Sequence, residues 1–74
     1  MNDTGTKLRK LSVVLSGHRT SVSLEDAFWA ELKTIARTEK RSLNDLIAEV
    51  DRDRESNLSS ALRVYVLRCR LINL

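Results

Sequence analysis

The stretch from Arg19 to Trp29 reads RTSVSLEDAFW, and it decides the fold. Its first six residues alternate between polar and less polar side chains, which is typical of a β-strand with one buried face. The face expected to turn inward holds Thr20, Val22 and Leu24. The face expected to turn outward holds Arg19, Ser21 and Ser23.

After Leu24 the spacing of the apolar residues changes to that of a helix. Glu25 and Asp26 supply the negative charge that suits a helix N-terminus. The apolar residues that follow at helical spacing are Phe28, Trp29, Leu32, Ile35 and Ala36. This pattern predicts a helix from about residue 25 to residue 39.

Upstream of this stretch, the segment from Leu11 to Leu15 is also rich in residues that favour β structure. Ser16 and Gly17 interrupt it, so residues 8–24 are expected to form one strand, or a hairpin of two. Residues 1–6 are polar and contain a glycine, and we expect them to be a flexible tail. Residues 7–74 then form a single domain.

Downstream, Ser42 with Asp45 three residues later resembles the start of a second helix, whose apolar residues are Leu43, Leu46, Ile47 and Val50. The polar segment 51–56 either extends this helix or links it to the next. Asn57 is expected to cap a third helix, which carries two apolar stripes. The first consists of Leu58, Ala61, Leu62, Tyr65, Val66, Cys69 and Ile72, and the second of Val64, Leu67, Leu71 and Leu74.

A helix that is apolar on two sides must be covered from two directions. In a chain of 74 residues the second cover is most simply another copy of the chain. The length points the same way, since so short a domain buries only about 60% of the surface that its unfolded chain exposes. With Cys69 as the only cysteine and His18 as the only histidine, neither an internal disulfide nor a structural metal site is expected to stabilise it.

Charge and composition narrow the classes of function. The net charge is only +3. However, residues 7–24 contain no acid and four bases, namely Lys7, Arg9, Lys10 and Arg19, so positive charge is concentrated at the predicted strands. The chain has no glycine-rich phosphate loop and no catalytic pairing of its single histidine and cysteine, so we expect no enzyme and no cofactor. No apolar run is long enough to span a bilayer, and we expect a cytoplasmic protein with no membrane partner.

The order of basic alternating strand, amphipathic helix, short basic turn and Ser-capped helix resembles the ribbon-helix-helix superfamily. Two strings, GHRTSVSLE (17–25) and NLSSALR (57–63), resemble a bacterial branch known mainly as uncharacterised ribbon-helix-helix domains. The resemblance spans roughly residues 10–70. The chain departs from the superfamily in having Glu25 where a proline usually begins the first helix, and in carrying the additional segment Leu11–Leu15.

The resemblance implies an α+β fold, mostly α, in which a β-ribbon is followed by two to three helices and two chains form an intertwined homodimer. It implies sequence-specific binding of double-stranded DNA and a role as a transcriptional regulator of the repressor kind. Base contacts in the major groove would come from Arg19, Ser21 and Ser23. Phosphate contacts would come from Lys40, Arg41, Ser42, Leu43 and Asn44, with Lys10 and His18 near the ribbon. The dimer core would consist of Val22, Leu24, Phe28, Trp29, Leu32, Leu46, Ile47, Leu62, Tyr65 and Val66.

Other interpretations of the pattern stay open. The outward strand residues and the basic turn Lys40–Arg41 also fit ordinary solvated surfaces, and Ser42 also fits a plain helix cap. The alternative function is an antitoxin-like or other protein-interaction dimer of the same fold. The sequence does not identify an operator, a small-molecule effector or a protein partner.

Overall fold

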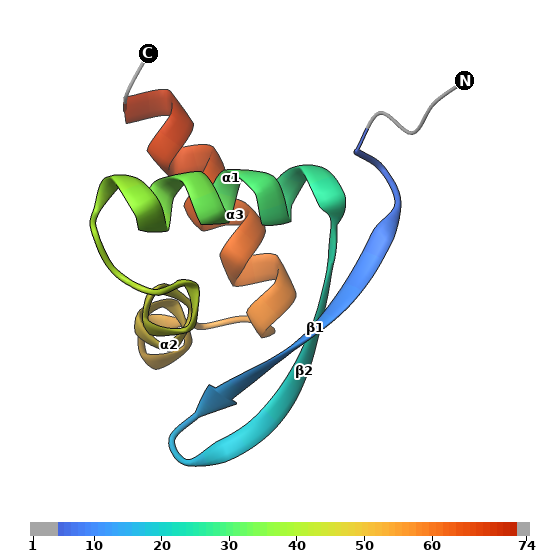
Figure 1. Ribbon diagram of the computed structural model, residues 1–74, viewed down its shortest axis with the longest axis vertical. Coiled ribbons are helices and arrows are strands. Elements are labelled where there is room, and N and C mark those ends of the chain that lie inside the picture. The colour runs from blue at the N-terminus through green and yellow to red at the C-terminus, as the bar shows by residue number, and fades with distance from the viewer. Residues whose placement is uncertain (1–4, 73–74) are drawn as a thin grey trace.

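The computed structural model describes residues 5–72, which form a β-hairpin followed by three helices (Figure 1). The strands are β1 (Leu8–Leu15) and β2 (His18–Glu25). The helices are α1 (Asp26–Thr38), α2 (Leu43–Asp53) and α3 (Leu58–Ile72). The predicted α+β class, with mostly helical content, is confirmed, and of the alternatives for residues 8–24 the hairpin is the one observed.

The hairpin turns through Ser16 and Gly17, whose φ angles are 53° and 81°. Positive φ at both central residues is the mark of a type I′ turn, whose twist matches that of the flanking strands. The two strands pair antiparallel in a register that sets Leu11 opposite Val22 and Val13 opposite Thr20. The segment Leu11–Leu15, whose role the sequence left open, is therefore part of β1, which pairs with β2 of the same chain to form the ribbon.

The inner face of the hairpin packs against the three helices, as the layers in Figure 1 show. Thr20 is half-buried, whereas Val22 and Leu24 are fully buried, so the predicted parity of β2 is confirmed. β1 adds Val13 and Leu15 to the same core. The helices contribute Trp29, Leu32, Ala36, Leu46, Ile47, Leu62 and Val66.

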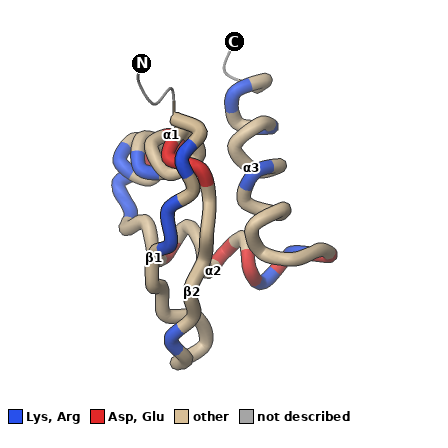
Figure 2. Tube along the Cα trace, turned by 90° about the vertical axis from the view of Figure 1, so that its right-hand side faces the viewer, with Lys and Arg blue, Asp and Glu red and all other residues tan. Residues whose placement is uncertain are grey.

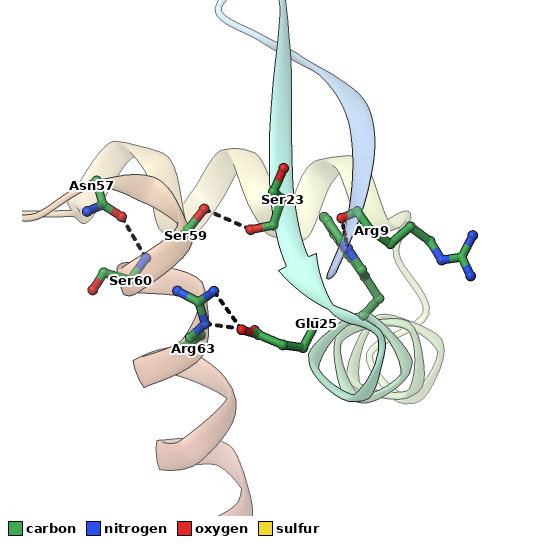
Figure 3. A network of polar contacts seen from close by, with 8 residues as sticks. Arg9, Ser23, Glu25, Asn57, Ser59, Ser60 and Arg63 are labelled. Carbon is green, nitrogen blue, oxygen red and sulfur yellow. Dashed lines mark hydrogen bonds and ion pairs between the residues drawn. The ribbon is translucent and has the colours of Figure 1, made fainter. Parts of the chain in front are cut away.

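Local capping explains where the helices begin and end. The Ser42 hydroxyl accepts a hydrogen bond from the Asp45 N–H at 3.0 Å, as the sequence predicted for α2. Asn57 Oδ1 accepts one from the Ser60 N–H at 2.8 Å, so the predicted cap of α3 is confirmed as well (Figure 3). The residues 51–53 extend α2, and residues 54–57 form the link to α3.

Two side chains from the helices occupy the outer edges of the ribbon. Asn44, in the first turn of α2, bonds both the N–H and the carbonyl of Val14, each at 2.8 Å. Ser59, in the first turn of α3, donates its hydroxyl to the Ser23 carbonyl at 3.1 Å (Figure 3). Both contacts lie on the sides that face away from the partner strand, because backbone groups along an antiparallel strand alternate between its two edges.

The residues predicted to form a dimer core lie together within the single chain. Eight of them are buried there, namely Val22, Leu24, Trp29, Leu32, Leu46, Ile47, Leu62 and Val66. Phe28 and Tyr65 are half-buried beside them. One chain thus covers this core itself, and the intertwined homodimer stays a prediction.

The segment before β1 was predicted to be a flexible tail, and its first four residues lie outside the described ones. The Gly5 carbonyl accepts a hydrogen bond from the Ala27 N–H at 3.0 Å, and the Lys7 carbonyl accepts one from the Asp26 N–H at 2.8 Å. Gly5 has φ of 90°, and a side chain there would come within 2.9 Å of the Ala27 Cβ. These contacts place residues 5–7 against the start of α1.

Candidate nucleic-acid interface

The outward face of the ribbon, here called the reading face, is built from both strands. Because residues directly opposite in an antiparallel pair share a face, β1 places Lys10, Ser12 and Val14 beside the predicted residues of β2. The reading face consists of six residues in three cross-strand pairs: Lys10 with Ser23, Ser12 with Ser21, and Val14 with Arg19. All six are exposed except Ser23, which is half-buried.

Sequence reasoning missed Ser12 and Val14 as members of this face. The alternation in β1 is broken by the adjacent Val13 and Val14, which hides the parity of the strand. The type I′ turn at Ser16–Gly17 was the available signal, since a two-residue turn fixes the register of a hairpin and hence which residues share a face.

Arg19 stands near the turn of the hairpin with an exposed side chain. Neither it nor Lys10 forms an ion pair with any residue in the range 5–72. Both cations are therefore available to an external anion. His18, in contrast, shares its face with Leu15, its cross-strand partner, and so points away from the reading face while remaining exposed at the turn.

One pair beyond the reading face, at the open end of the hairpin and on the same side of the ribbon, lies the acid Glu25, opposite Leu8. Arg63 of α3 donates to both of its carboxylate oxygens, at 3.0 and 3.2 Å (Figure 3). These hydrogen bonds and the positive charge of Arg63 hold the pKa of Glu25 below its ordinary value. The ion pair fixes the acid as a carboxylate and neutralises it, which removes a repulsive charge from a surface that would meet phosphates.

The start of α2 lies beside the ribbon because Asn44 bonds Val14 of β1. The N–H groups of a first helical turn have no partners within the helix. Ser42 takes the N–H of Asp45, which leaves those of Leu43 and Asn44 for an outside acceptor. The Asn44 side chain, by contrast, is engaged by β1, so only its backbone is free to contact a phosphate.

Lys40 lies in the turn between α1 and α2 with an exposed side chain and a φ of 57°. Its N–H bonds the Arg37 carbonyl at 3.1 Å, and the next N–H, that of Arg41, bonds the Ala36 carbonyl at 3.0 Å. This is the Schellman arrangement, whose left-handed position is usually a glycine. Lysine at this position carries a steric cost that a glycine would avoid.

The side chain of Arg41 is half-buried and contacts three other side chains, none of which the sequence predicted. Its guanidinium bonds Glu49 of α2, lies 2.8 Å from Glu39 and donates to the Tyr65 hydroxyl at 3.5 Å. The hydrogen bond to Glu49 is the chief cause that raises the pKa of Arg41. Arg41 therefore ties the α1–α2 turn to α2 and α3, whereas Lys40 beside it has no such contact among residues 5–72.

Figure 2 shows Lys and Arg along β1, α1 and α3 and near the hairpin turn, while Asp and Glu lie around the start of α1 and along α2. Within residues 5–72, no group of three or more metal-binding side chains is found. Across the same residues, the helices are all too short or too polar to cross a bilayer.

Comparison with known proteins is consistent with this geometry. A family model described as the ribbon-helix-helix domain matches residues 8–69. Among solved structures, an uncharacterised protein from Bordetella pertussis Tohama I is similar, with a TM-score of 0.84 and 30% identity. The match covers 99% of this chain and 63% of that protein, while no curated protein matches. Because the family model extends from β1 through most of α3, the chain belongs to the ribbon-helix-helix domain family.

Proposed function

We propose that the protein is a sequence-specific double-stranded DNA-binding protein that acts as a homodimeric transcriptional regulator, of the repressor kind, in the bacterial cytoplasm. The family to which it belongs generally binds DNA as a dimer. The observation that carries the proposal is the reading face, a two-stranded ribbon that exposes two hydroxyl groups opposite each other and an arginine without an ion pair among residues 5–72. A two-stranded β-ribbon is one of the elements that the major groove admits.

The residues divide into two roles. Arg19 is suited to a guanine edge, since a guanidinium bonds O6 and N7 together. Ser21 and Ser23 accept or donate, and Ser12 adds a third hydroxyl from β1. Lys10, Lys40 and the N–H groups of Leu43 and Asn44 are suited to phosphates, which position a protein without selecting a sequence. No catalytic role is proposed for any of them.

Titration with duplexes of random sequence, at low and at raised salt, tests DNA binding itself. We expect binding that weakens steeply as salt rises, because phosphate contacts release counterions. Selection of bound sites from a random duplex pool then tests specificity and should return a defined motif. Absence of binding at low salt would favour the alternative, an antitoxin-like or other protein-interaction dimer.

Duplex titration and site selection together distinguish the residues that contact bases from those that contact phosphates. Replacing a phosphate contact should weaken binding to all duplexes alike, whereas replacing a base contact should change the selected motif. Arg52→Gln is a matched control, since Arg52 is an exposed base on α2 that makes no ion pair among residues 5–72 and lies toward the acidic end of that helix.

A further inference from the structure

Large apolar side chains that are exposed among residues 5–72 lie in two regions. One region is α3, where the exposed residues are Val64, Leu67, Leu71 and Ile72. Leu74, predicted to continue an apolar stripe of this helix, lies outside the described residues. The other region is the hairpin, where Leu8 lies at the open end and Val14, 49% exposed, lies on the reading face. The proposed function gives no role to Val14.

A single exposed valine is ordinary on a protein surface, so the position of Val14 matters more than its exposure. The other five residues of the reading face are all polar or charged. Val13, the next residue in β1, is 6% exposed, so the alternation of the strand directs Val14 outward. Val14 is therefore the single apolar side chain that the reading face presents.

Asn44 holds the backbone of Val14 in place. Its side chain bonds the Val14 N–H and the Val14 carbonyl, each at 2.8 Å, and so fastens this part of β1 to the start of α2. Figure 1 shows α2 beside the turn end of the hairpin. Valine is branched at Cβ and has few rotamers, so little side-chain freedom is lost when it forms a contact. Val14 is thus a rigid apolar group at a fixed position.

Val14 and Arg19 are direct neighbours across the two strands. Because Asn44 bonds the backbone groups of Val14 from the outer edge of β1, this pair exchanges no backbone hydrogen bonds, and side chains in such a pair lie close together. Their Cβ atoms are expected to be about 4.5 to 5.5 Å apart. Successive base pairs are spaced by about 3.4 Å, so the two side chains reach bases that are one or two steps apart.

The major groove offers one apolar group to a protein, the methyl group on C5 of thymine. Cytosine has no methyl group at this position, and the other groups that mark the base edges in this groove are hydrogen-bond donors and acceptors. A valine side chain has neither a donor nor an acceptor. It can therefore distinguish bases through the C5 methyl group.

We infer that Val14 contacts the C5 methyl group of a thymine, within two base pairs of the guanine that Arg19 bonds. This inference rests on the proposed DNA binding and adds a thymine to the half-site that the protein selects. β1 thus reads bases as β2 does, and Val14 is a specificity-determining residue. A cytosine methylated at C5 carries the same methyl group and replaces the thymine in this contact.

Site selection followed by base replacement tests the contact. Selection with wild type and with Arg19→Ala identifies the guanine, because its preference is lost in the variant. Each thymine within two base pairs of it is then replaced by deoxyuridine, which lacks only the methyl group. We expect the affinity of the wild type to fall about fourfold for one such thymine in each half-site, the effect of burying one methyl group.

Val14→Ser assigns the effect to Val14, since it removes both methyl groups and resembles Ser12 of the same strand face. This variant should bind the thymine duplex and the deoxyuridine duplex equally well. Val64→Ser is the matched control, because Val64 is 45% exposed but lies on α3, and it should keep the fourfold difference of the wild type. Thermal melts confirm that both variants are folded.

Methylated cytosine tests the same contact without thymine. With a C·G pair in place of the T·A pair, methylation of that cytosine at C5 should strengthen wild-type binding about fourfold and leave Val14→Ser unaffected. A selected site without a thymine near the guanine, a wild type indifferent to the methyl group, or an equal effect in Val14→Ser would overturn the inference while leaving DNA binding intact. A wild type that binds no duplex at low salt would reject the proposed function, and this inference with it.

Discussion

The amide side chain of Asn44 forms two hydrogen bonds with the backbone of Val14, accepting from its N–H and donating to its carbonyl, both at 2.8 Å. Asn44 therefore supplies the hydrogen-bond partners that a neighbouring strand would offer to the backbone of Val14 at the edge of β1. The contact joins residues 30 apart in sequence and fastens the turn half of the ribbon to the start of α2. The distance between the reading face and the free N–H groups of α2 is thereby fixed.

Asn44→Ala should destabilise the fold by about 1 to 2 kcal/mol, the usual cost of removing hydrogen bonds to backbone groups at a partly covered edge. Asn44→Asp keeps the acceptor for the Val14 N–H but loses the donor, and should lie between wild type and alanine. Urea denaturation of the three proteins measures this order. Equal stability of the alanine variant and the wild type would show that solvent replaces Asn44 at no cost.

Arg19→Ala tests the assignment of the reading face. Because the side chain is exposed and unpaired among residues 5–72, stability should change by less than about 0.5 kcal/mol. Specific binding should weaken by about 1 to 3 kcal/mol per lost bidentate base contact. Thermal melts and gel shifts on the selected site measure the two effects, and full retention of specific affinity would remove Arg19 from the proposed interface.

Val22→Ala is the control for the opposite face of the same strand. Val22 is 3% exposed, so the truncation leaves a cavity in the core and should lower the free energy of unfolding by about 1 to 3 kcal/mol. The motif selected by the folded fraction should stay that of the wild type. A changed motif with unaltered stability would mean that the two faces of β2 had been exchanged.

The strand, the helices and most of the core were predictable because they depend on local periodicity. The alternation of residues 19–24 predicted which side of β2 is buried, and Ser42 and Asn57 act as the caps that their positions indicated. The pairing partner of β2 was left open, since the adjacent Val13 and Val14 break the alternation of β1.

The roles of individual polar residues were less predictable, because they depend on contacts between distant segments. Arg41 and Lys40 are neighbours with equal charge, yet only Arg41 meets Glu49 and Tyr65. Asn44 looked like a helix-start residue and also pairs with β1. No local sequence pattern predicts these contacts of Arg41 and Asn44, because they form only when α2 packs beside the hairpin and α3.

The ion pair between Glu25 and Arg63 predicts how stability depends on pH. The hydrogen bonds from Arg63 lower the pKa of Glu25 in the folded state, so the carboxylate form favours folding. Its contribution is complete above about 4.5, the ordinary value, and is lost as the pH falls through the lower pKa of the folded protein. Glu25→Gln should therefore be less stable than wild type at neutral pH, and the difference should shrink in acid. Urea titrations at several pH values measure it, and a difference that is independent of pH would contradict the prediction.

Lys40→Gly separates stability from DNA affinity at one position. Lys40 has a φ of 57°, in the left-handed region where glycine replaces a strained side chain without loss, so the variant should be more stable by up to about 1 kcal/mol. If Lys40 contacts a phosphate, the same variant should bind all duplexes more weakly and reduce the slope of affinity against salt by about one charge. Lys40→Arg keeps the charge and the strain, and should resemble the wild type in both measurements. A more stable glycine variant with unchanged affinity and salt dependence would remove Lys40 from the interface, because only the loss of charge is expected to weaken binding.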